Sequence, residues 1–216
     1  MIGIIDYGMG NIHSVQKALK SLGAKVLLTN KPEVLNKCEK IVLPGVGAFA
    51  DAVSEMDRQG LISAVIDAIK HKKIFLGICL GMQLLFETSE ESNGVKGLGV
   101  LRGEVKKFVP GRGLKVPHMG WNQLNTGISL PQRQEGDKGP GIKECPLLRG
   151  LSEKPYVYFC HSYYPQPEDK AVVAATTDYG INFASVVWQD NIIGVQFHPE
   201  KSQAVGLKIL KNFVEL

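Results

Sequence analysis

The stretch IFLGICLGMQ, residues 74–83, joins an apolar run to a helical pattern through a cysteine between two glycines. The apolar run is typical of a buried strand, and apolar side chains share one face of the segment that follows. Gly77 and Gly81 permit a sharp, strained turn that lifts the side chain between them above the edge of a sheet. The stretch therefore predicts a nucleophile elbow with Cys79 at its apex.

Apolar strand patterns alternate with helical patterns over about the first ninety residues. Such alternation predicts a mainly parallel sheet covered by helices on both faces. The expected strands are Ile2 to Ile5, Lys25 to Thr29, Lys40 to Leu43 and Ile74 to Ile78. The expected helical faces are Val15, Ala18, Leu19 and Leu22, then Leu61, Val65, Ala68 and Ile69, then Met82, Leu85 and Phe86.

The second half of the chain has short alternating strand patterns, which favour antiparallel additions to the central sheet. A final helix begins after Ser202, a plausible N-cap, with Leu207, Leu210 and Val214 at helical spacing. The predicted fold class is α/β: a mainly parallel central sheet flanked by helices, with antiparallel strands added. These added strands are expected at Val105 to Val109, Tyr156 to Cys160, Val172 to Thr176, Ser185 to Trp188 and Ile192 to Phe197.

Composition excludes several classes of protein. A chain of 216 residues with 44% hydrophobic content suits one soluble domain over residues 1–216. The net charge is +4, but the lysines are scattered without dense runs, so no nucleic-acid partner is expected. No apolar run reaches the roughly 20 residues of a membrane span, and no signal-peptide pattern is present. We therefore expect no membrane association and a cytoplasmic location.

The four cysteines differ in their setting. They are irregularly spaced, which suggests neither a disulfide framework nor a zinc site, and no cofactor or metal is expected. By itself, the pentapeptide around Cys79 suits a buried small apolar residue as well as a nucleophile. Its predicted place at a helix N-terminus favours a thiolate, because backbone N–H groups and the helix dipole point toward it. Cys38, Cys145 and Cys160 lack such a setting and are interpreted as structural.

A base and a carboxylate follow the last strand pattern in QFHPE, residues 196–200. On an extended backbone, His198 and Glu200 project to the same side, and Pro199 restricts His198 to extended conformations. A carboxylate beside an imidazole fixes its tautomer and stabilises the imidazolium, so the other ring nitrogen can take a thiol proton. A histidine alone after a strand is usually a surface residue; combined with Cys79, it predicts a Cys-His-Glu triad.

Several motifs together closely resemble the class I, triad-type glutamine amidotransferases, and the resemblance runs essentially from end to end. It is carried by GICLGMQ (Gly77 to Gln83), PGVGAF (Pro44 to Phe49) and QFHPEKS (Gln196 to Ser202). Three more motifs resemble, more narrowly, the glutaminase subunit of imidazole glycerol phosphate synthase: DYGMGN (Asp6 to Asn11), PHMGWN (Pro117 to Asn122) and FCHSYY (Phe159 to Tyr164).

The resemblance implies roles for individual residues. Cys79 would be the nucleophile, His198 the acid and base, and Glu200 its orienting group. The strand end Gly45-Val46-Gly47 would supply oxyanion-hole donors, Val46 and Gly47, with the Leu80 N–H as a further donor. L-Glutamine would be held by Gln83, His161, Ser162 and Tyr163.

The resemblance also implies a partner. The chain would form a heterodimer with a cyclase subunit built as a (β/α)8 barrel, which receives the ammonia and makes imidazole glycerol phosphate in histidine biosynthesis. Asn11, Trp121 and Lys201 become candidate contacts on the docking face. Because a free glutaminase would waste glutamine, we expect the Gly45–Gly47 loop to keep a donor turned away until the partner is loaded.

Three alternatives stay open on the residues. The chain could feed ammonia to another enzyme, such as one acting on surface sugars, or act alone as a Cys-His hydrolase of the same fold. A non-catalytic module is disfavoured by the complete set of Cys79, His198 and Glu200. The polar stretch Thr126 to Cys145 predicts a long surface loop, and the segment from Asn125 to Gly150 is longer than the family pattern requires.

Overall fold

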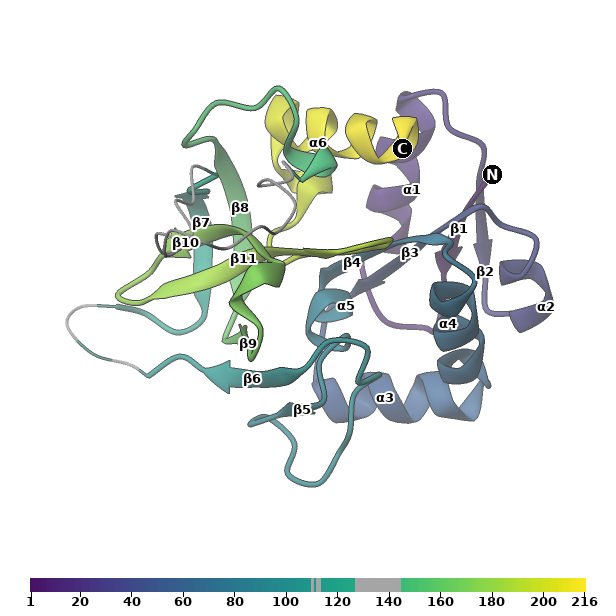
Figure 1. Ribbon diagram of the computed structural model, residues 1–216, viewed down its shortest axis with the longest axis horizontal. Helices are drawn as coiled ribbons and strands as arrows, with labels where there is room; N and C mark the ends of the chain where they lie inside the picture. Colours follow the sequence, from purple (N-terminus) through teal and green to yellow (C-terminus); the bar gives the residue numbers. More distant parts are fainter. Residues whose placement is uncertain (110, 112–113, 127–144) are drawn as a thin grey trace, which may run out of the picture.

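A computed structural model describes residues 1–109, 111, 114–126 and 145–216. The expected loop from Thr126 to Cys145 therefore lies almost entirely outside the described residues. A seven-stranded sheet forms the centre, with the strand order β10-β11-β12-β4-β3-β1-β2 (Figure 1). Its strands are Ile2–Ile5 (β1), Val26–Thr29 (β2), Lys40–Gly45 (β3), Ile74–Cys79 (β4), Val173–Asp178 (β10), Asn182–Gln189 (β11) and Ile192–Val195 (β12).

Helices cover both faces of this sheet. In Figure 1, α1 and α6 lie above it and α3 and α4 below it. The helices are Ile12–Ser21 (α1), Pro32–Leu35 (α2), Phe49–Arg58 (α3), Leu61–Lys70 (α4), Leu80–Gln83 (α5) and Gln203–Glu215 (α6). Short 3-10 turns are Pro146–Leu148 (η1), Lys170–Val172 (η2) and Pro199–Lys201 (η3).

The two layers of core follow from the alternation of side chains along the strands. Ile5, Leu43 and Phe75 pack on the face of α3 and α4, whereas Ile4 and Val42 pack on the face of α1 and α6. All five side chains are fully buried. The strands are apolar on both faces because helices remove both faces from water, which is the reason for their continuous apolar sequence.

The predicted parallel half is confirmed. β2, β1, β3 and β4 pair in parallel, and β12 joins them in parallel beside β4. The strand over Ile192 to Phe197 was expected to be an antiparallel addition to the sheet. In the structure this strand is β12, which ends at Val195 and is antiparallel to β11 but parallel to β4. Its position next to β4 matters for the site, because the segment after β12 leaves the sheet beside the segment after β4.

The expectation that all later strands extend the central sheet is wrong in part. Of the later strands in the described part of the chain, only β10, β11 and β12 join it. The remaining strands form two smaller sheets, β5-β6-β9 and β7-β8, on the β-rich side of the molecule (Figure 1). They are Thr88–Ser89 (β5), Gly103–Lys107 (β6), His118–Gln123 (β7), Tyr156–His161 (β8) and Tyr163–Pro167 (β9).

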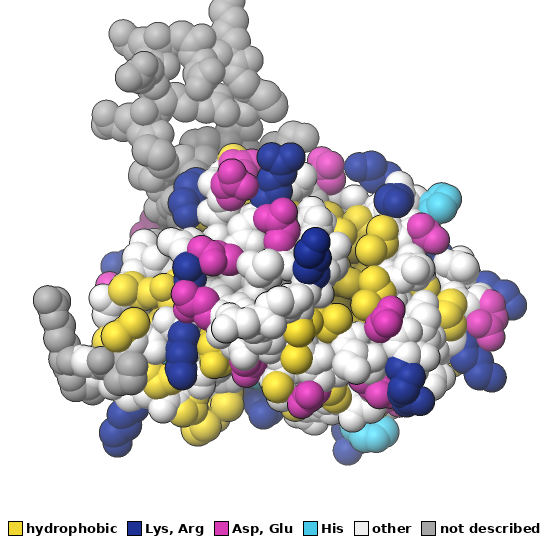
Figure 2. Space-filling view, turned by 90° about the horizontal axis from the view of Figure 1, so that it is seen from below, with side chains coloured by type: hydrophobic (Ala, Val, Ile, Leu, Met, Phe, Trp, Pro, Cys, Tyr) yellow, Lys and Arg dark blue, Asp and Glu magenta, His cyan; other side chains and the backbone are white. Residues whose placement is uncertain are grey.

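Figure 2 shows the underside of the molecule as it is oriented in Figure 1. Acidic and basic side chains are interspersed with apolar ones on this face. Charge of one sign does not gather into a single patch on this face. Among the described residues, no helix combines the length and the apolar character needed to cross a membrane.

Candidate active site

Cys79 lies on a strained turn between β4 and α5. Its φ angle is +55°, a conformation that costs free energy in a residue other than glycine and that persists at functional sites. A Cβ on Gly81 would overlap the Leu43 carbonyl oxygen, and one on Gly77 would press on the backbone of Gly81. The two glycines therefore permit the strained turn that the sequence predicted, and they also let the elbow close against β3.

The helix after the elbow is shorter than expected. α5 ends at Gln83, so Leu85 and Phe86 do not lie on it. The carbonyl groups of Leu84 and Leu85 accept hydrogen bonds from Leu98 and Val100 instead of continuing a helix. A single turn carries only a small dipole, so helix-dipole support for a Cys79 thiolate is weaker than the sequence suggested.

The carboxyl ends of the parallel strands bring the other candidates to Cys79. Gly45, at the end of β3, pairs with Cys79 in the β3–β4 register. β12 lies on the other side of β4, and three residues beyond its end the chain reaches His198. Sites in open α/β sheets lie at this edge, where consecutive strand ends meet.

Hydrogen bonds to β8 hold the backbone around His198. The His198 N–H donates to the Tyr158 carbonyl at 2.9 Å, and the Ser202 hydroxyl donates to the His198 carbonyl at 2.6 Å. The Tyr158 N–H in turn donates to the Ser202 hydroxyl at 2.9 Å. Ser202 stands at the N-cap position of α6, but its side chain makes no cap hydrogen bond. Its hydroxyl instead links Tyr158 on β8 to His198 in the segment after β12.

Glu200 contacts His198 as expected, though by another backbone geometry. His198 Nδ1 lies 2.8 Å from Glu200 Oε1, and both side chains are almost fully buried. The backbone of His198 is extended, but Glu200 lies in the 3-10 turn η3, which begins at Pro199. The expectation that both residues share an extended strand was wrong, because proline at the first turn position starts a helical turn.

The imidazole of His198 is held in its charged form. Burial opposes a charge there, but hydrogen bonds to Cys79 and Glu200 and the negative charge of both partners outweigh burial. Together they raise the pKa of His198 from 6.5 to about 10. Since Nδ1 faces Glu200, Nε2 is the nitrogen left to exchange a proton with the Cys79 sulfur.

Two further groups contact the Cys79 sulfur. The Gln196 side-chain amide donates toward Sγ at 3.6 Å, and Sγ donates to the Cys160 carbonyl at 3.9 Å. Sequence reasoning missed Gln196. Its place two residues before His198 was a usable signal, because strand residues two apart face the same side.

Of the residues expected to hold glutamine, Gln83, His161 and Tyr163 lie in one hydrogen-bonded group. The carbonyl of Tyr163 accepts from Gln83 Nε2 at 3.0 Å and from His161 Nδ1 at 2.7 Å. The Tyr163 ring is partly exposed, and Ser162, between the two residues, uses its carbonyl to accept the Phe108 N–H.

A second histidine, His118, contacts His161 in the core. His118 Nδ1 and His161 Nε2 are 3.0 Å apart, and Asn122 Nδ2 lies 3.2 Å from His118 Nε2. Because the Tyr163 carbonyl can only accept, His161 carries its proton on Nδ1 and accepts from His118. Burial lowers the pKa of His118 to about 4 and that of His161 to about 3, so both rings are neutral at neutral pH.

The candidate oxyanion-hole segment follows β3 directly. Gly47 has a φ of +110°, which glycine adopts without strain, and Val46 is exposed. The carboxylate of Glu91 accepts the Phe49 N–H at 2.7 Å and so anchors the segment where α3 begins. The buried Tyr7 hydroxyl lies against Gly45, and burial, with the nearby Cys79, raises the pKa of Tyr7.

Two of the docking candidates, Trp121 and Lys201, lie beside Tyr158. The Trp121 ring, 46% exposed, meets the Tyr158 ring edge-on at 6.1 Å, and Lys201 Nζ lies 5.8 Å from the same ring. Met119, two residues before Trp121 on β7, is exposed as well. Asn11 precedes α1 in the loop after β1, at the same edge of the sheet as Cys79.

Comparison with known proteins decides the family. The model of the family described as glutamine amidotransferase class-I matches residues 3–216. The chain belongs to the class I glutamine amidotransferases. Two relatives are each named imidazole glycerol phosphate synthase subunit HisH. The one from Syntrophotalea carbinolica is 47% identical over 221 residues, and the one from Methanocaldococcus jannaschii is 46% identical over 216 residues. In both cases the match covers 100% of this chain and of the relative.

Solved structures share the fold of this class I glutamine amidotransferase at low sequence identity. A crystal structure described as a glutamine amidotransferase has a TM-score of 0.73 at 19% identity and covers 100% of this chain and 99% of its own. A structure described as PurLQS from Thermotoga maritima has a TM-score of 0.71 at 18% identity, covering 99% and 97%. These likenesses bear out the predicted fold class.

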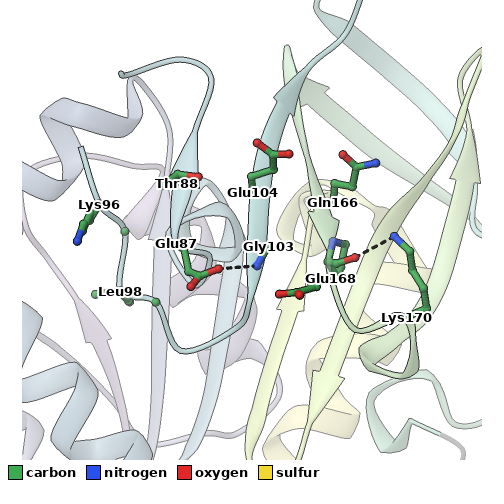
Figure 3. Close-up of a pocket in the computed structure, with 12 residues that line it drawn as sticks. Glu87, Thr88, Lys96, Leu98, Gly103, Glu104, Gln166, Glu168 and Lys170 are labelled. Carbon is green, nitrogen blue, oxygen red and sulfur yellow. Dashed lines mark hydrogen bonds between the residues drawn. The ribbon is translucent and has the colours of Figure 1, made fainter. Parts of the chain in front are cut away.

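A pocket of about 860 Å³ lies elsewhere on this class I glutamine amidotransferase, along β5, β6 and β9 (Figure 3). Glu87 accepts the Gly103 N–H at 3.0 Å on one side, and Lys170 donates to the Pro167 carbonyl at 2.8 Å on the other. Cys79, His198 and Glu200 are not among its lining residues. The pocket is therefore a feature separate from the Cys79 site.

Proposed function

We propose that this chain is the glutaminase subunit of an imidazole glycerol phosphate synthase, hydrolysing L-glutamine to glutamate and ammonia. The observation that carries the proposal is the placing of His198 between Cys79 and the buried Glu200 at the carboxyl edge of the sheet. Full-length relatives named as subunits of that synthase support the choice of acceptor reaction.

The first chemical step is acyl transfer to sulfur. Cys79 Sγ, having given its proton to His198 Nε2, attacks the side-chain amide carbon of glutamine. The carbonyl oxygen becomes an oxyanion, which the N–H groups of Val46 or Gly47 and of Leu80 stabilise. His198 then protonates the amide nitrogen, which leaves as ammonia, and a γ-glutamyl thioester remains on Cys79.

Hydrolysis of the thioester completes the cycle. His198, now neutral, takes a proton from water as the water oxygen attacks the thioester carbonyl carbon. The C–S bond breaks, glutamate leaves and Cys79 regains its proton or remains a thiolate paired with the imidazolium. Glu200 stabilises the imidazolium in both halves of the reaction by holding Nδ1.

The ammonia would pass to a cyclase subunit, built as a (β/α)8 barrel, that docks over the carboxyl edge of the sheet. The exposed Trp121 and Met119 give this face the aromatic and methionine side chains that protein interfaces favour, and Lys201 lies beside Tyr158. Asn11 lies at the same edge and extends the candidate face. In the absence of the loaded partner, the Gly45–Gly47 segment would keep a donor turned away from the oxyanion.

The test is glutamate release by the purified chain, alone and with the cyclase subunit from the same genome plus its nucleotide substrate. Large stimulation by the loaded partner, abolished in Cys79→Ala but retained in Cys160→Ser, is the expected result. Equal rates with and without the partner would contradict the synthase assignment: two low rates would indicate another acceptor enzyme, and two high rates a free-standing hydrolase.

A further inference from the structure

The Cys79 sulfur has a hydrogen-bond donor that the mechanism above does not use. Gln196 Nε2 lies 3.6 Å from Sγ, within the longer range of hydrogen bonds to sulfur. The Gln196 side chain is 0% exposed, so this amide cannot exchange its partner for water. A buried amide keeps its orientation only if both of its ends find partners.

Neighbouring groups decide which end of the amide faces the sulfur. The Gln83 amide must direct its nitrogen toward the Tyr163 carbonyl, because a carbonyl oxygen only accepts. The same nitrogen of Gln83 donates to Gln196 Oε1 at 3.2 Å. The oxygen of the Gln196 amide is thereby engaged, and its N–H group is the one that remains for Cys79.

The histidine pair fixes this arrangement from the other side. His161 Nδ1 donates to the Tyr163 carbonyl that Gln83 also contacts, and His118 holds the far nitrogen of His161. Both rings stay neutral, so each offers one donor nitrogen and one acceptor nitrogen and carries no charge. One chain of hydrogen bonds therefore runs from His118 through His161 to the Tyr163 carbonyl, and another runs from Gln83 through Gln196 to Cys79.

The two polar neighbours of the sulfur favour different protonation states. The Cys160 carbonyl can only accept, so it stabilises the S–H form, whereas the Gln196 N–H can only donate, so it stabilises the thiolate. We propose that Gln196 is a further catalytic residue, which donates its side-chain N–H to the Cys79 thiolate and which Gln83 positions. The proposal rests on the proposed role of Cys79 as the nucleophile.

Other charged or titratable groups near the sulfur stay in place when Gln196 is changed. They are His198 and Tyr7, with Glu200 behind His198 and the neutral His161 on the β8 side. A change in the reactivity of Cys79 on substitution of Gln196 therefore reports the loss of the amide. This holds if a substitution at a neighbouring residue, which leaves the Gln196 amide in place, has no effect.

The experiment measures the rate of iodoacetamide alkylation of the Cys79 peptide against pH, by mass spectrometry of the full-length chain. In Gln196→Met, which keeps the side chain's length but removes the donor, the pH of half-maximal rate should rise by about one unit, the effect of one hydrogen bond to a charged group. Gln196→Glu should raise it further, because a carboxylate would face the thiolate.

Two more variants separate this role from packing. Ser185→Ala changes a buried residue whose carbonyl accepts the Gln196 backbone N–H, and it should leave the pH profile unchanged. Gln83→Met removes the group that orients Gln196 and should raise the midpoint by a smaller amount. If the Gln196 variants do not fold, Gln83→Met tests the proposal in their place. An unchanged dependence of the alkylation rate on pH in Gln83→Met would then overturn the proposal.

The outcomes distinguish the inference from the proposed function. If wild-type Cys79 reacts with a midpoint near the value of an ordinary thiol, about 8.5, the role of Cys79 as an activated nucleophile fails, and the inference fails with it. If the wild-type midpoint is lowered but Gln196→Met and Gln196→Glu share it, the proposed function stands and the role of Gln196 is refuted.

Discussion

The proposed nucleophile and the proposed base of this site are positioned in different ways. Cys79 is placed by the backbone of a few adjacent residues, because Gly77 and Gly81 allow a strained turn to close against β3. His198 is placed by a distant strand, since its N–H bonds Tyr158 and its carbonyl bonds Ser202. The first arrangement depends on these two glycines and on the close contact of Gly81 with β3, whereas the second depends on the docking of β8.

This difference has a functional consequence. The strand that holds His198 also carries Tyr158, whose ring contacts the exposed Trp121 and lies beside Lys201. A partner that binds these side chains would therefore press on the segment that positions the base and not on the elbow. Under the proposed docking, the base would respond to the partner while the elbow stays in place.

The elbow should break when its close approach is filled. In Gly81→Ala, the new Cβ overlaps the Leu43 carbonyl oxygen, so β3 and the elbow must separate. We expect a loss of at least about 3 kcal/mol in the free energy of unfolding, measured by urea denaturation. Gly23→Ala is the control: Gly23 has a φ of +81° with open space around it and should lose only about 1 kcal/mol. Equal losses would contradict the steric account.

The charge on the base should respond to its carboxylate. Glu200→Gln keeps an acceptor for His198 Nδ1 but removes a negative charge, so the pKa of His198 should fall from about 10 and glutamate release should drop about 100-fold. The raised pKa stabilises the fold fully below about pH 6.5, and this contribution is lost as the pH rises to about 10.

Urea unfolding at pH 6.5, 8 and 10 checks this sign. The wild type should lose more stability than Glu200→Gln between pH 6.5 and pH 10. Parallel curves for the two proteins would show that Glu200 does not hold the charge on His198.

The link from β8 to the base should matter less than the carboxylate. Ser202→Ala removes the hydroxyl that joins the Tyr158 N–H to the His198 carbonyl, leaving two buried polar groups without this partner. We expect a loss of about 1–3 kcal/mol in stability and a smaller loss of activity than in Glu200→Gln. Ser21→Ala removes an exposed hydroxyl bonded to the Ala18 carbonyl and should change neither, as melting and glutamate-release assays can show.

The docking face should affect partner affinity more than the fold. Trp121→Ala removes a half-exposed ring that packs on Tyr158. The affinity of this variant for the cyclase subunit should fall at least about 30-fold, which is the effect of losing an interface hot spot. Leu27→Ala, on the edge strand β2, should bind as the wild type does. Calorimetric titration of the partner measures both, and equal affinities would remove Trp121 from the interface.

The sequence was sufficient for the elbow and the parallel half because their causes are local. Apolar runs encode strands buried on both faces, and Gly77 and Gly81 encode the turn. It was insufficient for α5, which ends after one turn because Leu98 and Val100 supply N–H groups to Leu84 and Leu85. Such tertiary hydrogen bonds leave no periodic signal, and helical spacing of apolar residues misled the prediction.

Tertiary contacts that leave no periodic signal also explain which features of the site the sequence did not predict. Short alternating strands do not specify their partners, so the separate β7–β8 sheet could not be derived from the chain. Ser202 was interpreted as a helix cap, although its hydroxyl bonds to Tyr158 and His198. The position of Gln196 gave the direction of its side chain, but its contact with Cys79 depends on Gln83 and Tyr163.

Trapping the acyl-enzyme tests directly whether Cys79 is the nucleophile. Rapid acid quenching of the chain during glutamine turnover with its loaded partner, followed by peptide mass spectrometry, would detect a glutamyl group on Cys79. We expect this thioester on the Cys79 peptide of the wild type. In Cys79→Ala, both the thioester and glutamine turnover should be absent. Glutamate release that persists in Cys79→Ala, or a glutamyl group on another residue, would contradict it.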